Sequence, residues 1–279
     1  MSESSIRSSN SQTKLVDIEK VFSEKNPRLL KWIPRFVLGY VKRLIHQETI
    51  NRIVHDHGHE KGIAFARAGL KECMAEVTQQ GLEQIPEGKR YLFASNHPLG
   101  GLDGVALISV VGEKFPDLKF PVNDILLHLE PLNNIFIPVN KLGAQSKEKV
   151  SLFDQAFASD SQILFFPAGL VSRKINGKVT DLQWKSSFVK KAIASQRDIV
   201  PVYVSGRNSN FFYNLARFRK FIGLKINIEM VFLPDELFRA KTKKIVIKFG
   251  TPIPWQSLQD GRSLNEWVDI IRQKSYEMA

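Results

Sequence analysis

Residues 91–104 read YLFASNHPLGGLDG, an apolar run followed by a short segment that holds one histidine and one aspartate. The apolar run, 91–95, is typical of a buried strand, and a helical pattern of apolar residues follows at 104–114. Pro98 disfavours helical backbone at the residue before it, so we expect His97 to project from the end of the strand. The stretch therefore predicts a strand, a tight loop and a helix, with two chemically active side chains at the loop.

Strand and helix patterns alternate along the rest of the chain. Apolar runs predict strands at 91–95, 119–122, 135–139, 162–166, 199–204, 225–232 and 244–249. Helical patterns predict helices at 104–114, 123–130, 146–159, 185–196, 210–221 and 264–277. This alternation predicts an α/β fold, in which helices flank a mixed, mostly parallel sheet. We expect a disordered tail over 1–14, a helical motif over 15–59 and one α/β domain over 60–279.

The helical motif contains an amphipathic stretch rich in aromatic and basic residues. Residues 28–46 read RLLKWIPRFVLGYVKRLIH and place apolar side chains near helical spacing, with Arg and Lys beside them. This pattern is typical of a helix that lies in a membrane interface, and it also fits a helix packed on the protein's own core. Pro34 is expected to kink the helix or to divide it into two pieces.

The charge of the chain points to an anionic partner. Forty Lys and Arg residues against 28 Asp and Glu residues give a net charge of +12 and an isoelectric point near 9.7. Nucleic acid and anionic lipid both fit such a charge. The sequence contains no zinc finger, no RNA-binding aromatic signature and no isolated basic recognition helix. We therefore expect an anionic membrane surface and no nucleic acid, with a basic nucleic-acid-binding module as the remote alternative.

No stretch reaches the roughly 18 consecutive apolar residues of a membrane-spanning helix. The N-terminal sequence MSESSIRSSNSQTK is polar and lacks the apolar core of a signal peptide. Cys73 is the single cysteine, so an internal disulfide is excluded and a reducing compartment is expected. These features predict a cytoplasmic protein that contacts a membrane only from its surface.

Three histidines stand at alternate positions in HDHGHEKG, residues 55–62. Alternate spacing brings side chains to one face only in a strand, whereas the flanking segments have helical patterns. Gly58 instead favours a turn between two helices, with His55, His57 and His59 in solvent. Because no cysteine or obvious set of carboxylates completes a ligand sphere, no metal site is expected here.

The spacing of His97 and Asp103 permits two interpretations. Gly100 and Gly101 allow the chain to fold back, which places Asp103 near the cap of the following helix. The carboxylate of Asp103 would then accept the Nδ1 hydrogen of His97 and leave Nε2 free as a general base. The alternative is an aspartate that caps its helix beside an exposed histidine. The spacing alone leaves both interpretations open.

A second polar segment, FFPAGLVSRK at 165–174, follows the predicted strand at 162–166. In open α/β sheets, ligands gather outside the carboxyl ends of the strands. The Pro-Ala-Gly turn, together with Arg173 and Lys174, provides backbone amides and positive charge where an anion can bind. The alternative is a solvated loop.

Four blocks in order resemble the glycerolipid acyltransferase superfamily, the lysophosphatidate acyltransferases and their relatives. The blocks are NHPLGGLD (96–103), LNNIFIPVNK (132–141), FFPAGLVSR (165–173) and IVPVYVSG (199–206). NHPLGGLDG, FPAGLVSR and SGRNSNFFY (205–213) are most similar to a bacterial branch described as hemolysin-like or lyso-ornithine-lipid-type acyltransferases. The resemblance implies an α/β acyltransferase domain preceded by a membrane-associating helical motif.

The resemblance also implies a mechanism. His97, paired with Asp103, would deprotonate a lyso-lipid hydroxyl, which attacks the thioester of an acyl carrier protein or coenzyme A. Turn amides around Gly169 would stabilise the oxyanion, and no metal or bound cofactor is expected. The implied substrate-binding residues are Asn96, Gly100, Gly101, Asn140, Lys141, Pro167, Gly169, Ser172, Arg173 and Arg207.

The sequence departs from the superfamily pattern at three places. Five residues separate His97 and Asp103, where the usual motif has four. Val139 stands in place of an arginine, and Ala168 in place of a glutamate. In relatives those two side chains are tied to the phosphoglycerol part of the acceptor. We therefore expect a lyso-lipid without phosphate, such as a singly acylated amino-acid lipid, with lysophosphatidate as the alternative because other cations remain nearby. A serine hydrolase is excluded because no Gly-x-Ser-x-Gly elbow is present.

Overall fold

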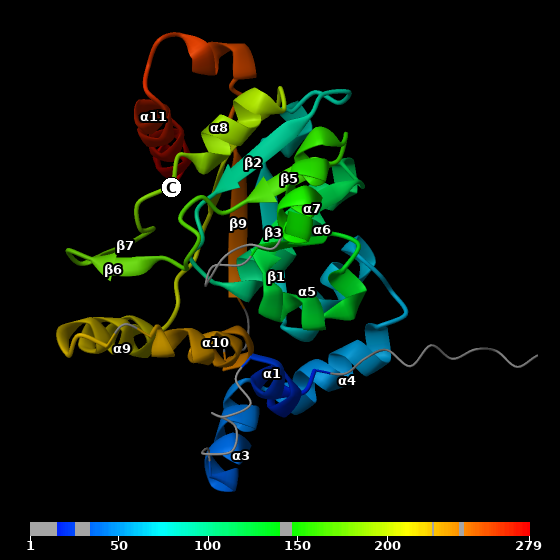
Figure 1. The fold of residues 1–279 in the computed structure, drawn as a ribbon, viewed down its shortest axis with the longest axis vertical. Coiled ribbons are helices and arrows are strands. Elements are labelled where there is room, and N and C mark those ends of the chain that lie inside the picture. The colour runs from blue at the N-terminus through cyan, green and yellow to red at the C-terminus, as the bar shows by residue number, and fades with distance from the viewer. Residues whose placement is uncertain (1–15, 26–33, 140–146, 225, 240–242) are drawn as a thin grey trace, which may run out of the picture.

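A computed structural model describes residues 16–25, 34–139, 147–224, 226–239 and 243–279. Among these residues, seven strands form one sheet with the order β1-β9-β8-β2-β5-β3-β4 (Figure 1). The strands are β1 (Ala75–Gln80), β2 (Tyr91–Ser95), β3 (Leu118–Asn123), β4 (Phe136–Val139), β5 (Gln162–Phe165), β8 (Asp198–Val204) and β9 (Lys243–Phe249). All neighbours pair in parallel except β8 and β9. The prediction of a mixed, mostly parallel sheet is confirmed.

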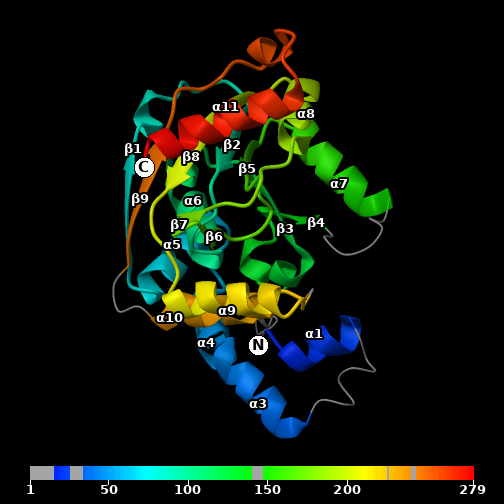
Figure 2. The same ribbon diagram turned by 90° about the vertical axis from the view of Figure 1, so that its left-hand side faces the viewer.

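Helices cover both faces of the sheet and one of its ends (Figures 1 and 2). The longer helices are α1 (Ile18–Lys25), α3 (Arg35–Leu44), α4 (Gln47–His57), α5 (Ile63–Glu72), α6 (Gly101–Lys114), α7 (Lys147–Ala158), α8 (Ser187–Ala194), α9 (Asn210–Phe221), α10 (Leu233–Arg239) and α11 (Leu264–Glu277). α5 and α6 pack on one face in one apolar core, whereas α7, α8 and α11 pack on the other face in a second core. A short antiparallel hairpin, β6 (Arg173–Ile175) and β7 (Lys178–Thr180), stands beside the sheet.

Strand β2 lies at the centre of the sheet and is buried along its whole length. Tyr91 and Phe93 contribute to the core under α5 and α6, while Leu92 and Ala94 contribute to the core under α8 and α11. Side chains of a strand alternate between faces, so a strand covered on both sides is apolar throughout. The strand predicted at 91–95 therefore carries His97 directly out of the middle of the protein.

Two predicted elements differ in the structure. The alternating apolar residues at 225–232 predicted a strand, but Ile228–Phe232 forms the 3-10 helix η4, followed directly by α10. The helix predicted at 123–130 consists of two short 3-10 helices, η2 (Asp124–His128) and η3 (Glu130–Leu132). β1 was not predicted because its AEVTQQ sequence is mostly polar. It is an edge strand with an exposed outer side, and its backbone pairs with β9.

The N-terminal region is described in part. α3 begins at Arg35, directly after Pro34, a position at which proline is compatible with the start of a helix. The predicted tail at 1–14 and residues 28–33 of the amphipathic stretch lie outside the described residues, and the division into tail, motif and domain stays a prediction. No helix among the described residues is long and apolar enough to cross a membrane.

The predicted turn between two helices at the histidine cluster is present. α4 ends at His57, and Gly58 follows it as the C-cap residue. The imidazole of His57 lies 3.2 Å from a carboxylate oxygen of Glu60 and 3.6 Å from one of Glu72. These contacts join α4 to the turn before α5 and to the last residue of α5, so His57 is partly buried, whereas His55 and His59 are exposed as expected.

Arg197, directly before β8, is completely buried. Its guanidinium donates to backbone carbonyl oxygens, with Nε 3.0 Å from Phe157 and Nη1 2.7 Å from Ser161, and Nη2 also donates to Ser159. The carbonyl groups at the end of α7 have no helical partners, so this cation satisfies them. Burial lowers the pKa of Arg197 to about 10, and the group is still charged near neutral pH.

Replacing Arg197 with lysine is expected to lower the free energy of unfolding by about 3 kcal/mol, because an ammonium group cannot make the same set of divergent charged hydrogen bonds. Urea denaturation measures this change. The matched control is Arg52→Lys, which alters an exposed ion pair with Glu72 and is expected to cost less than about 1 kcal/mol. Equal effects of the two substitutions would contradict the role given to Arg197.

Candidate active site

His97 and Asp103 lie together at the carboxyl end of β2. His97 stands in the loop after the strand, and Asp103 stands in the first turn of α6. Nδ1 of His97 lies 3.0 and 3.1 Å from the two carboxylate oxygens of Asp103, whose side chain is fully buried. The backbone N–H of Leu99 donates to the same carboxylate at 2.9 Å. The pair expected from the sequence is thus formed, and the insertion of one residue in the motif does not prevent it.

The contact with Asp103 determines which nitrogen of His97 is free. A carboxylate accepts a hydrogen bond, so Nδ1 carries the hydrogen and Nε2 is the unprotonated nitrogen of the neutral ring. Nε2 has no hydrogen-bond partner within the described part of the chain, and the side chain is 16% exposed. The ring of Phe166 stacks on the imidazole at a centroid distance of 3.9 Å. The imidazole is therefore held in one plane with its basic nitrogen available.

Close packing shapes the loop between His97 and α6. Gly100 has a φ of 82° and a ψ of −123°, a conformation that L side chains rarely adopt. A Cβ atom at this position would lie 3.1 Å from the side chain of Leu233, in α10. Gly101 is exposed and has open space around it. Gly100 is thus required by the loop, whereas Gly101 leaves room beside the histidine.

The backbone of His97 is held by a second buried carboxylate, which the sequence did not reveal. The N–H of His97 donates to Oδ1 of Asp181 at 3.2 Å, and the hydroxyl of Ser172 donates to the same oxygen at 2.5 Å. The indole of Trp184 donates to Oδ2 at 2.8 Å. Burial raises the pKa of Asp181, which these hydrogen bonds oppose. Asp181 follows His97 by 84 residues, and no spacing pattern links them.

Three residues expected to contact substrate have structural partners instead. Asn96 is buried, and its amide donates to the carbonyl of Val204 at 2.9 Å and accepts from the N–H of Val204 at 2.6 Å. Ser172 is buried, and its hydroxyl is engaged by Asp181 as described, while its N–H donates to the carbonyl of His97 at 2.8 Å. The polar groups of both side chains are used inside the protein. Both side chains therefore help to hold the loop in place.

Arg173 is the third such residue. Its Nη2 lies 2.7 Å from a carboxylate oxygen of Glu229, and its Nη1 donates to the carbonyl of Val171 at 2.6 Å. Glu229 is completely buried and is also 2.9 Å from Nε of Arg219. Burial lowers the pKa of Arg173, and the charge of Glu229 opposes this shift. The guanidinium is therefore committed to an internal ion pair and is not exposed for an anion, whereas the neighbouring Lys174 is exposed.

The remaining predicted residues lie around the site. The N–H of Gly169 donates to the carbonyl of Phe166 at 3.0 Å, so this turn amide is not available as an oxyanion donor in this conformation. Pro167 is buried, and its carbonyl accepts from the N–H of Lys185. Arg207 is exposed, and its Nη2 lies 2.5 Å from Oδ1 of Asn210. Asn140 and Lys141, also expected to bind substrate, lie outside the described residues.

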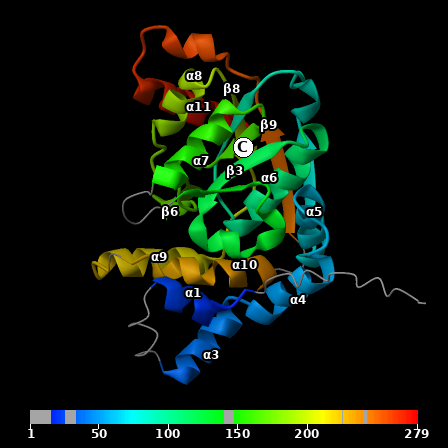
Figure 3. The same cartoon turned by 45° about the vertical axis from the view of Figure 1, so that its right-hand side comes forward.

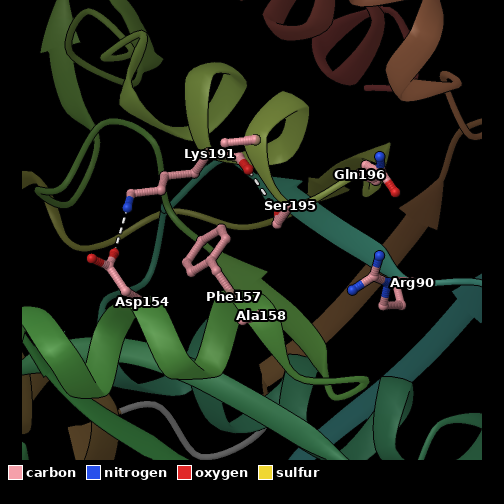
Figure 4. Close-up of a pocket in the computed structure, with 8 residues that line it drawn as sticks. Arg90, Asp154, Phe157, Ala158, Lys191, Ser195 and Gln196 are labelled. Carbon is pink, nitrogen blue, oxygen red and sulfur yellow. Dashed lines mark hydrogen bonds and ion pairs between the residues drawn. The ribbon is translucent and has the colours of Figure 1, made fainter.

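A hollow of about 350 Å³ lies at the opposite end of the sheet (Figure 4). Its lining comprises Arg90, Asp154, Phe157, Ala158, Lys191, Ala194, Ser195 and Gln196. Arg90 directly precedes β2 and Gln196 precedes β8, so this hollow is at the amino ends of the strands. It contains none of the predicted site residues and is separate from His97.

Asn96→Ala is expected to lower the free energy of unfolding by about 1–3 kcal/mol, because the buried N–H and carbonyl of Val204 lose their partners. Chemical denaturation measures the change. The control Asn133→Ala removes an exposed amide and should change stability by less than about 0.5 kcal/mol. If Asn96→Ala is as stable as the unaltered protein, the hydrogen bonds of Asn96 to Val204 do not stabilise the fold and this role is refuted.

Comparison with known proteins adds three similarities. Two curated relatives named lyso-glycine lipid O-acyltransferase, from Bacteroides thetaiotaomicron and Phocaeicola vulgatus, are each 41% identical over 265 residues. These alignments cover 95% of this chain and 97% and 95% of the respective relatives. A crystal structure of the 1-acyl-sn-glycerophosphate acyltransferase from Thermotoga maritima is 16% identical with a TM-score of 0.47, covering 76% of this chain and 75% of that one.

The sequence profile of the Acyltransferase family matches residues 20–279, which is most of the chain. The match includes the His97–Asp103 loop and all strands of the sheet. The resemblance inferred from the four sequence blocks is confirmed. The protein belongs to the Acyltransferase family and is an acyltransferase.

Proposed function

We propose that this acyltransferase transfers a fatty acyl group from an acyl thioester to the hydroxyl of a lyso-glycine lipid. The observation that carries the chemistry is the buried Asp103 carboxylate on Nδ1 of His97, with Nε2 left free. The acceptor rests on the two relatives of that name, which are 41% identical along almost their whole length. Acyl carrier protein and coenzyme A are both suitable carriers of the acyl thioester.

The reaction proceeds through general-base catalysis. Nε2 of His97 takes the proton of the acceptor hydroxyl while the hydroxyl oxygen attacks the thioester carbonyl. The carboxylate of Asp103 stabilises the imidazolium that forms. When the tetrahedral intermediate collapses, the carbon–sulfur bond breaks and His97 returns the proton to the leaving thiolate. The products are an ester and a free thiol, and the residues named here require no cofactor for these steps.

The oxyanion of the intermediate needs hydrogen-bond donors close to His97. The N–H of Gly169 is engaged within its own turn. The first turn of an α-helix has backbone N–H groups without helical partners and carries a partial positive charge. α6 begins at Gly101, beside the imidazole, and has 14 residues. We therefore assign oxyanion stabilisation to the first turn of α6.

The acceptor preference follows from two positions at which a positive charge is replaced or already paired. Val139 is the last residue of β4. β4 is the third strand from β2 in the sheet, so the two strands lie roughly 14 Å apart. An apolar side chain at this position cannot bind phosphate, and Arg173 is already paired with Glu229. A glycine lipid has a single carboxylate in place of a phosphate and requires fewer cations. The structure of the site therefore favours a lyso-lipid without phosphate.

We place the enzyme peripherally on an anionic membrane, at the cytoplasmic face of the inner membrane. α3 exposes Phe36, 78% accessible, and Tyr40, 53% accessible, next to the exposed Arg43. Aromatic side chains with adjacent cations are typical of helices in a membrane interface. Such a position gives the site access to an acceptor that resides in the bilayer.

His97→Ala is expected to reduce acyl transfer by about 100- to 10,000-fold, because the general base is lost. Asp103→Asn should also reduce transfer strongly, since an amide cannot stabilise the imidazolium. The assay follows acceptor-dependent release of the free thiol. The control is His59→Ala, which changes an exposed histidine outside the site. Turnover near that of the unaltered enzyme in a folded His97→Ala protein would refute the base.

The acceptor is tested by competition between two lipids. With one acyl donor, the enzyme is expected to acylate lyso-glycine lipid and to convert lysophosphatidate poorly, because Val139 stands in place of an arginine and Arg173 is paired with Glu229. Mass spectrometry of the lipid products measures both reactions in one vessel. Efficient conversion of lysophosphatidate with none of the glycine lipid would reverse the assignment and would leave the acyl-transfer chemistry intact.

A further inference from the structure

Helix α9 and the segment after it expose a group of large apolar side chains, which we call the α9 ridge. The ridge consists of Phe211, Phe218, Phe221, Ile222, Ile226 and Val231. Phe221 is 87% exposed and Ile226 is 71% exposed. Large apolar side chains gathered on one surface mark an interaction site, whereas isolated ones are ordinary. We propose that the α9 ridge is a second membrane-binding surface, which inserts its side chains among anionic lipids and is distinct from the N-terminal helices.

Phe218, Phe221 and Ile222 are each more than half exposed, whereas Phe211 also contacts the ring of Phe232 at a centroid distance of 5.1 Å. Phe211, Phe218 and Ile222 are separated by seven and four residues, so they lie on one side of the helix. The other side of α9 buries Phe212 and Tyr213 against Val171. The helix therefore satisfies the protein core with one face, while its opposite face is apolar and open.

The charged residues along α9 and the segment directly after it are all positive. Residues 205–228 contain five Arg and Lys residues and no Asp or Glu. Arg217 and Lys220 are exposed and have no ion-pair partner within the described ranges. The next acid along the chain, Glu229, is completely buried between two arginines. Exposed phenylalanines with cations and without acids match the interface of an anionic bilayer in both polarity and charge.

The segment is attached firmly to the catalytic loop. The amide of Asn208 donates to the carbonyl of Pro98 at 3.2 Å, and Leu233 packs closely over Gly100. The buried pair of Arg173 and Glu229 joins the hairpin after β5 to η4. α9 and α3 extend from the same end of the molecule in all three views (Figures 1, 2 and 3). Contact of both with one bilayer brings the membrane surface close to His97.

A probe at position 221 tests insertion directly. Cys73, the single cysteine of the sequence, is buried, and burial raises its pKa to about 11, so a thiol introduced at the surface reacts selectively. Phe221→Cys is labelled with an environment-sensitive fluorophore and mixed with phosphatidylglycerol–phosphatidylcholine vesicles. The control Leu152→Cys places the same label at an exposed site of α7, away from α9 (Figure 2).

We expect the label at 221 to shift to shorter wavelength with the anionic vesicles and to be quenched by spin-labelled lipid, with no such change at 152. High salt or vesicles of phosphatidylcholine alone should weaken the response, because screening reduces attraction of the cations. Vesicle-bound protein whose label at 221 is neither shifted nor quenched would overturn the proposal. This readout requires no enzyme activity, so it does not depend on the proposed function.

A second measurement uses substitutions. Phe218→Ser with Phe221→Ser is expected to weaken partition onto the anionic vesicles at least about tenfold. The matched control, Val150→Ser with Leu152→Ser, removes two exposed apolar side chains of α7 and should bind as the unaltered protein does. Equal binding of both double variants contradicts the proposal. So does a dimer in lipid-free solution that the phenylalanine substitutions convert to monomer, since the ridge would then contact a second copy.

Discussion

The Asp103 carboxylate has no access to solvent, and a buried charge is tolerated only where hydrogen bonds replace the lost water. Two donors from the preceding loop supply them, the Nδ1–H of His97 and the N–H of Leu99. Both contacts exist only if the chain reverses at Gly100 and enters α6 in one particular geometry. The electrostatic requirement of the Asp103 carboxylate thus shapes the loop, fixes the imidazole of His97 and leaves Nε2 without a hydrogen-bond partner in the described part of the chain.

Distant parts of the chain hold this loop from several sides. Asp181 takes the N–H of His97, and Asn96 joins the end of β2 to the end of β8 through Val204. The N–H of Ser172 reaches back to the carbonyl of His97 from the loop after β5. Polar residues of the sequence motifs therefore act largely as internal supports. A general base benefits from such support because its orientation is set before the substrate arrives.

The spacing of apolar residues predicted those helices and strands whose buried side chains recur with the period of the element. The bounds of β2, α9 and α11 agree closely with the periods of their sequences, and the His97–Asp103 pair followed from a strand end and a helix start. The strand expected at 225–232 failed because its alternation would place Glu229 on a solvent-facing side, whereas Glu229 is completely buried between Arg173 and Arg219. Those partners, like Asp181 for His97, lie far apart in sequence. The spacing of residues in one sequence does not reveal ion pairs and hydrogen bonds between such distant positions. The internal partners of Ser172 and Arg173 were therefore not predicted, and both residues were expected to bind substrate.

The central claim is that Asp103 holds His97 in the tautomer with hydrogen on Nδ1. Nitrogen-15 NMR of histidine-labelled enzyme reports this directly, because protonated and unprotonated ring nitrogens have widely separated shifts. The His97→Ala protein identifies the signals. At a pH where the ring is neutral, the account predicts an Nδ1 signal of protonated type and an Nε2 signal of unprotonated type, with the pattern lost or mixed in Asp103→Ala. A His97 ring with its hydrogen on Nε2 in the unaltered enzyme would contradict the account.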